Sequence, residues 1–132
     1  MNVIADTNVL LRAVLGDDDE QSSVAKQALL SAEKVVLSHH ALCELAWVLR
    51  SRYGASRANI TLALETLCRA ENAVVNVGAY DAGMAMLVAG ADFADGVIAY
   101  EGAMLGGDEF LSFEKKAVTA LTRHGKRARL LA

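Results

Sequence analysis

Asn2-Val3-Ile4-Ala5-Asp6 opens the chain with a short apolar run that ends in an acid. The run predicts a short strand, residues 2–5, that delivers Asp6 to the end of a sheet. Further acids interrupt apolar segments at three later places: Glu44 within 42–49, Asp92 and Asp95 ahead of 96–99, and Glu114 after 110–113. A buried carboxylate without a partner is costly, so we expect these acids to converge on one shared cation.

Short apolar runs alternate with amphipathic patterns along the whole chain. The runs predict strands at 3–5, 35–37, 73–77, 109–111 and 128–131. The patterns predict helices at 7–15, 20–32, 40–54, 57–71, 79–90, 94–105 and 114–124, with Ser38 and Ser56 as N-caps and Gly54 as a helix end. This alternation is typical of an α/β three-layer sandwich, in which helices flank a mostly parallel five-stranded sheet. Ligands of such sheets bind at the carboxyl ends of the strands, where Asp6 and residues 112–114 are expected.

The length and composition predict one globular domain, residues 1–132. Hydrophobic residues make up 54% of the chain and charged residues 22%, which argues against disorder. The N-terminus lacks a basic leader, and the longest uncharged apolar stretch, 82–91, is about half the length of a membrane helix. We therefore expect a cytoplasmic protein without membrane contact.

Charge is unevenly distributed. Residues 115–132 hold six of the 13 basic residues and no acid. This tail could contact phosphates or form a solvated helix face, and the sequence leaves both possibilities open. The acidic run 17–20 predicts the N-terminal end of a helix, where acids favour the dipole.

Cysteine and histidine give no sign of a site of their own. Cys43 and Cys68 lack C-x-x-C spacing and are expected to be small buried apolar residues. His39 and His40 are adjacent, so their side chains should point apart, and we interpret them as non-ligands.

The acids themselves allow structural as well as chemical interpretations. Glu44 lies beside the apolar face of its helix and, taken alone, could be a surface residue. Asp92 and Asp95 are three residues apart and so share one side of a helix, with Asp92 able to act as its cap. Thr7 and Asn8 could orient water or ligands, or could cap a helix.

A cation is the simplest remedy for several carboxylates in one place. Two carboxylates about 4 Å apart repel by about 1 kcal/mol in water and by about 4 kcal/mol at an effective dielectric constant near 20. Carboxylate oxygens without convergent Cys or His favour Mg²⁺ or Mn²⁺ over zinc. Such a site is suited to hydrolysis of a phosphodiester.

In the order and spacing of four segments, the chain resembles the PIN-domain ribonucleases, specifically the VapC toxins of VapBC toxin-antitoxin pairs. The segments are Asp6-Thr7-Asn8-Val9-Leu10-Leu11-Arg12, Glu44-Leu45-Ala46-Trp47-Val48-Leu49, Asp92-Phe93-Ala94-Asp95-Gly96-Val97-Ile98-Ala99 and Phe110-Leu111-Ser112-Phe113-Glu114-Lys115-Lys116-Ala117. Two positions depart from the family pattern. Ser112-Phe113-Glu114 stands where Thr-Phe-Asp is usual, and Gly96 stands where Ala is usual.

The resemblance implies a site, a cofactor and partners. Asp6, Glu44 and Asp95 correspond to the metal-binding acids, Asp92 to an accompanying acid, Ser112 to a small hydroxyl residue and Glu114 to the last acid. The implied cofactor is Mg²⁺ or Mn²⁺, and the implied partners are an RNA substrate, a cognate antitoxin and a second copy in a homodimer. Arg12, Ala13 and the region 50–57 are implied as antitoxin or RNA contacts.

Other functions fit the residues less well. A phosphatase of the haloacid-dehalogenase type needs a second Asp two residues after the first, and Asn8 occupies that place. A receiver domain needs a phosphoacceptor Asp at a middle strand end, where this chain has Asn76. A PIN-fold protein that has lost activity and only binds a partner stays open.

Overall fold

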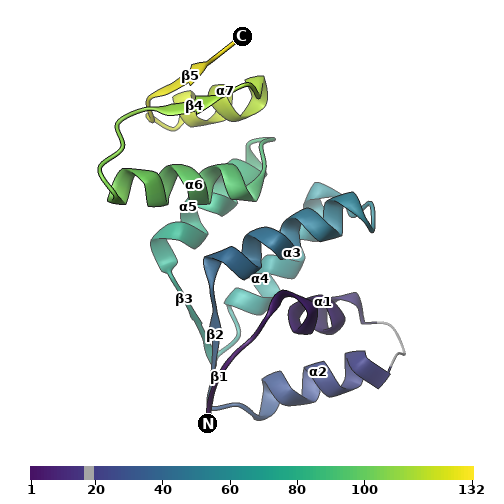
Figure 1. Ribbon diagram of the computed structural model, residues 1–132. Helices are drawn as coiled ribbons and strands as arrows, with labels where there is room; N and C mark the ends of the chain where they lie inside the picture. Colours follow the sequence, from purple (N-terminus) through teal and green to yellow (C-terminus); the bar gives the residue numbers. More distant parts are fainter. Residues whose placement is uncertain (17–19) are drawn as a thin grey trace. The chain divides into compact units, whose positions relative to one another are not determined.

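The computed structural model describes residues 1–16 and 20–132, which form seven helices and five strands (Figure 1). In chain order these are β1 (Asn2–Ile4), α1 (Thr7–Leu15), α2 (Glu20–Ser31), β2 (Lys34–Leu37), α3 (His39–Ser51), α4 (Arg57–Cys68), β3 (Ala73–Val75), α5 (Val77–Val88), α6 (Phe93–Met104), β4 (Phe110–Ser112), α7 (Lys115–Arg123) and β5 (Ala128–Leu130). All five expected strands and all seven expected helices are confirmed. The chain divides into two compact units, Met1–Asn76 and Val77–Ala132, which we call the N-terminal and C-terminal units.

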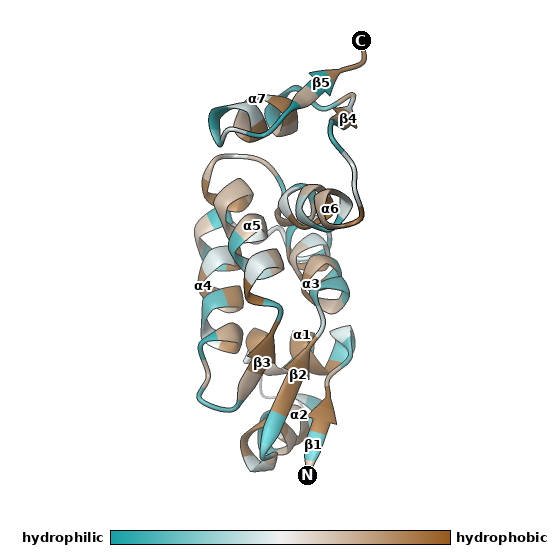
Figure 2. Cartoon of the chain, turned by 90° about the vertical axis from the view of Figure 1, so that its left-hand side faces the viewer, coloured by the Kyte–Doolittle hydropathy of each residue, from teal (hydrophilic) through white to brown (hydrophobic). Residues whose placement is uncertain are grey.

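A three-stranded parallel sheet, in the order β1-β2-β3, organises the N-terminal unit. Its central strand β2 lies between its two neighbours and is largely apolar (Figure 2). Val35 and Leu37 of this strand are buried, and Val35 is opposite both Val3 and Ala73. Parallel neighbours need crossover connections, which α1 and α2 provide between β1 and β2, and α3 and α4 between β2 and β3.

Helix caps begin α3 and α4 where the sequence predicted them. The hydroxyl of Ser38 accepts a hydrogen bond from the Ala41 N–H at 3.1 Å, and that of Ser56 accepts one from the Asn59 N–H at 3.1 Å. The end of α3 was predicted too late, because the helix ends at Ser51. Gly54 lies in the following turn, where its φ of 59° suits a residue without a side chain.

Two side chains anchor α2 inside the N-terminal unit. The buried Ser22 hydroxyl donates to the Arg12 carbonyl of α1 at 2.8 Å. Asn72 donates from its Nδ2 to the carbonyls of Leu29 and Ala32 at 2.9 and 3.0 Å, so the turn before β3 holds the end of α2. Residues 17–19 of the acidic run lie outside the described residues, and Glu20 is the first residue of α2.

The C-terminal unit contains a parallel pair of strands, β4 and β5, connected through α7. Phe110 is opposite Ala128, and Ser112 is opposite Leu130. Within the two units, the five expected strands lie in a parallel sheet of three and a parallel pair, and every pair is parallel as predicted. Hydrophobic periodicity identifies a strand but does not determine which neighbour it pairs with, so the pairing within each unit comes from the structure.

Helices α5 and α6 approach each other closely at two glycines. A Cβ added at Gly83 would lie 2.5 Å from the Phe93 ring, and one at Gly96 would lie 2.0 Å from the Ala82 carbonyl oxygen. The backbone oxygen cannot move aside as a flexible side chain could. The close approach therefore requires Gly96, which explains one of the two departures from the family pattern.

We expect Gly96→Ala to destabilise the protein by about 1–2 kcal/mol, because overpacking costs more than the helix propensity gained. Gly102 lies in the same helix, and a Cβ there would meet nothing within 4 Å. Gly102→Ala is thus the matched control and should be neutral or stabilising by up to about 1 kcal/mol. Urea denaturation followed by circular dichroism measures both free energies of unfolding. Equal stability of the two variants would contradict the role assigned to Gly96.

Candidate active site

Asp6 is held at the junction between β1 and α1. It is the N-cap of α1, and its Oδ1 accepts a hydrogen bond from the Val9 N–H at 3.1 Å. The residue is exposed, so the carboxylate remains accessible to solvent. The cap that the sequence allowed for Thr7 or Asn8 is thus formed by Asp6 itself.

Glu44 projects from α3 and reaches the first residue of α1. Its Oε1 accepts a hydrogen bond from the Thr7 hydroxyl at 3.1 Å and lies 3.3 Å from His40 Nε2. The Glu44 side chain is 55% exposed, as the surface interpretation predicted. Because Thr7 follows Asp6 directly, this hydrogen bond brings the two acid-bearing segments of the N-terminal unit together.

Asp92 and Asp95 form the start of α6. Asp92 is the N-cap, as predicted, and Asp95 Oδ2 accepts a hydrogen bond from the Asp92 backbone N–H at 3.1 Å. Asp92 is exposed and Asp95 is half-buried. The three-residue spacing therefore produces a capping arrangement as well as a pair of neighbouring carboxylates.

Ser112 and Glu114 occupy the turn from β4 into α7. The Ser112 hydroxyl accepts a hydrogen bond from the Glu114 N–H at 2.9 Å. Glu114 is the N-cap of α7, yet its side chain makes no capping hydrogen bond. Glu114 is exposed, and in the described part of the chain its carboxylate has no partner, so it is available to a ligand.

The described residues of each unit bring acids together in pairs rather than in larger groups. Asp6 and Glu44 belong to the N-terminal unit, and Asp92, Asp95 and Glu114 belong to the C-terminal unit. Among the described residues, no three His, Cys, Asp or Glu side chains form a group that could hold a metal ion. The donor chemistry suits Mg²⁺ or Mn²⁺, because these are carboxylates open to solvent. Convergence of all the acids on one cation stays a prediction.

A model of the PIN domain matches residues 3–99 of the sequence. The chain belongs to the PIN-domain family. The match includes Asp6, Glu44, Asp92 and Asp95, ends before Ser112 and Glu114, and runs across the boundary between the two units. PIN domains are generally nucleases that use divalent metals. No curated protein matches the chain.

His40 is the neighbour of this PIN domain's candidate acids that sequence analysis missed. Its adjacency to His39 favours the interpretation of His40 as a non-ligand, whereas its distance from Glu44 in the sequence places it on the same helix face as that acid. Residues four apart on a helix face each other, so the spacing of His40 and Glu44 was the available signal. The contact places a titratable ring beside a candidate metal-binding acid of the PIN domain.

The two cysteines of the PIN domain are less buried than the sequence predicts. Cys43 and Cys68 are half-buried rather than fully buried, which corrects the sequence expectation. Burial raises the pKa of the Cys68 thiol to about 12, so this group stays protonated at neutral pH.

No helix in the described ranges, 1–16 and 20–132, has the length and apolar character needed to cross a bilayer.

We expect Asp6→Ala to destabilise the PIN domain by about 1 kcal/mol, because the N-cap hydrogen bond to Val9 is lost. Asp6→Asn keeps a side-chain oxygen for that hydrogen bond while removing the charge, so it should retain nearly all of the stability. Thermal unfolding of both variants measures the difference. A stable Asp6→Ala variant would show that the cap contributes nothing.

Proposed function

We propose that this protein is a Mg²⁺- or Mn²⁺-dependent endoribonuclease, and that it acts in the cytoplasm as the toxin of a VapBC-type pair. In this proposal Asp6, Glu44 and Asp95 hold the metal, while Asp92, Glu114 and Ser112 assist. The observation that carries it is a set of carboxylates in a PIN domain, of which Asp6 and Asp92 are exposed at helix starts, Asp95 is half-buried in the first turn of α6 and Glu44 is exposed on α3. The metal, when bound, polarises a phosphoryl oxygen and activates water.

The protein's own residues orient the proposed ligands before any metal binds. The Val9 N–H holds one oxygen of Asp6, and the Thr7 hydroxyl holds one oxygen of Glu44. Each carboxylate keeps a second oxygen for which no hydrogen bond is described. Oriented carboxylates of like charge favour a divalent cation, because the cation removes their repulsion.

The order of the acid-bearing segments supports the toxin assignment. A groove of about 850 Å³ between α1 and α2 supports the proposed antitoxin partner, since Val9, Val24 and Ala28 line it beside Arg12. Its lining combines these apolar side chains with Arg12 and Glu20, which fits an amphipathic peptide segment that carries charged residues. The proposed homodimer rests on the resemblance to the VapC toxins.

A PIN-fold protein that binds partners without cleaving RNA is the second candidate. The observation that favours it is Glu114, which replaces the usual aspartate at the last acid position. Activity therefore has to be measured rather than assumed from membership of the family.

We expect purified protein to cleave RNA with Mg²⁺ or Mn²⁺ and to lose this activity in EDTA. Asp6→Asn and Asp95→Asn should each reduce cleavage by at least about 100-fold, because loss of a carboxylate weakens metal binding. Gel analysis of a labelled RNA pool, followed by sequencing of the cleaved ends, measures the rate and identifies the substrate.

Two controls accompany this assay. One is a variant that loses an acid outside the proposed site, and the other is the absence of contaminating nuclease. Asp81→Asn removes an exposed acid of α5 that has no assigned role, and it should leave the cleavage rate unchanged. Near wild-type cleavage by either Asp6→Asn or Asp95→Asn, in protein free of contaminating nuclease, would contradict the proposed site.

Substitutions at Glu114 test whether the departure from the family pattern affects cleavage. Its extra methylene moves the carboxylate by roughly 1 Å, which is enough to turn a direct contact into a water-mediated one. We expect Glu114→Gln to reduce the rate less than Asp6→Asn, and Glu114→Asp to maintain or raise it. Cleavage rates and Mn²⁺ affinities of the three variants decide this. If Glu114→Gln has the same cleavage rate and the same Mn²⁺ affinity as the wild type, Glu114 has no role in the site and serves only as the N-cap residue of α7.

A further inference from the structure

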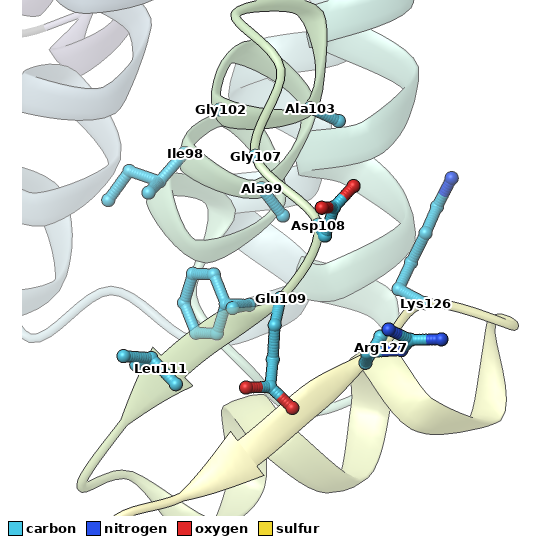
Figure 3. A pocket seen from close by; sticks show the side chains of 11 residues that line it. Ile98, Ala99, Gly102, Ala103, Gly107, Asp108, Glu109, Leu111, Lys126 and Arg127 are labelled. Carbon is cyan, nitrogen blue, oxygen red and sulfur yellow. The ribbon is translucent and has the colours of Figure 1, made fainter.

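A pocket of about 370 Å³ lies entirely within the C-terminal unit (Figure 3). Its walls are the second half of α6, the segment 107–109, the start of β4 and the two residues before β5. Pockets of this size are in the range that small ligands occupy. The function proposed above assigns nothing to it.

The pocket is at the opposite end of β4 from Glu114. Phe110, which lines the pocket, is the first residue of β4, and Ser112 is the last. Two steps along a strand separate their Cα atoms by about 7 Å. The pocket therefore lies at the amino ends of β4 and β5, whereas Ser112 and Glu114 follow the carboxyl end of β4.

One wall is apolar and consists mainly of small residues. Ala99, Gly102 and Ala103 of α6 lie in it beside the larger Ile98, and Phe110 adds an aromatic ring to the lining. A Cβ at Gly102 would meet nothing within 4 Å, so the space above this residue is open. A flat aromatic ligand suits such a wall, because it can stack without displacing a side chain.

Three charged side chains of the pocket lack partners among the residues that the structure describes. They are Asp108, Lys126 and Arg127, whereas Glu109 is paired with Arg129 at 3.1 Å. The side chains of Asp108 and Lys126 extend in the same general direction from the pocket wall (Figure 3). A ligand that satisfies all three groups must present hydrogen-bond donors to a carboxylate and negative charge to two cations.

We propose that this pocket binds one guanine nucleotide. The base lies against the wall formed by Ala99, Gly102 and Ala103, and its N1–H and N2–H₂ donate to the Asp108 carboxylate. The phosphate is held by Lys126 and Arg127. An ionised carboxylate only accepts hydrogen bonds, and guanine presents two adjacent donors on its Watson–Crick edge, whereas adenine and cytosine present only an amino group there.

The same chemistry could come from a guanosine of the RNA substrate or from a free guanine nucleotide. Binding of an RNA guanosine rests on the proposed nuclease function. In that case the pocket would recognise one base of the substrate at a distance from the cleavage site. The basic tail, residues 115–132, favours a polyanion near this pocket.

The test uses the full chain in EDTA, where the proposed nuclease is inactive. Titrations with 5′-GMP, 5′-AMP and a short RNA containing one guanosine or one inosine are followed by NMR. We expect GMP to bind at least about fivefold more tightly than AMP, and guanosine more tightly than inosine, which lacks the N2 amino group. Gly102→Leu, which fills the open space, and Asp108→Asn should each weaken GMP binding about tenfold.

Arg123→Ala is the matched control, because it removes a cation of the same tail that does not line the pocket. It should change GMP affinity less than twofold. Weakening of both GMP and RNA binding by the pocket variants supports an RNA guanosine, and weakening of GMP binding alone supports a free nucleotide. Unchanged GMP affinity in Asp108→Asn, or equal affinity for GMP and AMP, overturns the proposal. A protein that binds GMP but cleaves no RNA would instead refute the nuclease function alone.

Discussion

Free backbone N–H groups at the starts of helices are the constraint around which the acids of this protein are arranged. The first turn of a helix leaves donors unsatisfied and carries partial positive charge, so a carboxylate there stabilises the fold. Asp6, Asp92 and Glu114 all occupy N-cap positions, and Asp95 lies in the first turn of α6. The proposed metal site uses the negative charge of these same residues. In that proposal, stability and chemistry depend on the same side chains.

Glu44 is the exception, since it lies in the middle of α3 and gains nothing from a helix end. The Thr7 hydroxyl and the His40 ring hold its carboxylate instead. Thr7 directly follows the N-cap of α1, so packing of α1 on α3 determines where Glu44 meets the Asp6 segment. The geometry of this pair is a property of the tertiary structure, even though each residue is recognisable alone.

The glycines of the C-terminal unit have two different roles. Gly83 and Gly96 allow the backbones of α5 and α6 to approach, so their lack of a side chain is a packing requirement. Gly102 faces open space in the same helix and contributes instead to the apolar wall of a pocket. One helix thus carries candidate acids at its first turn, a packing surface in its middle and a ligand-sized pocket towards its end.

The sequence by itself determined the α/β class, the existence of every strand and helix, the caps at Ser38, Ser56 and Asp92, and the membership of a nuclease family. These follow from local periodicity, from backbone groups satisfied within a few residues, and from motifs whose spacing is readable along the chain. The tertiary structure alone decided how the strands pair, that His40 and Thr7 surround Glu44, and that Gly96 is required by the carbonyl of Ala82. Such features depend on contacts between segments distant in sequence, which no local pattern specifies.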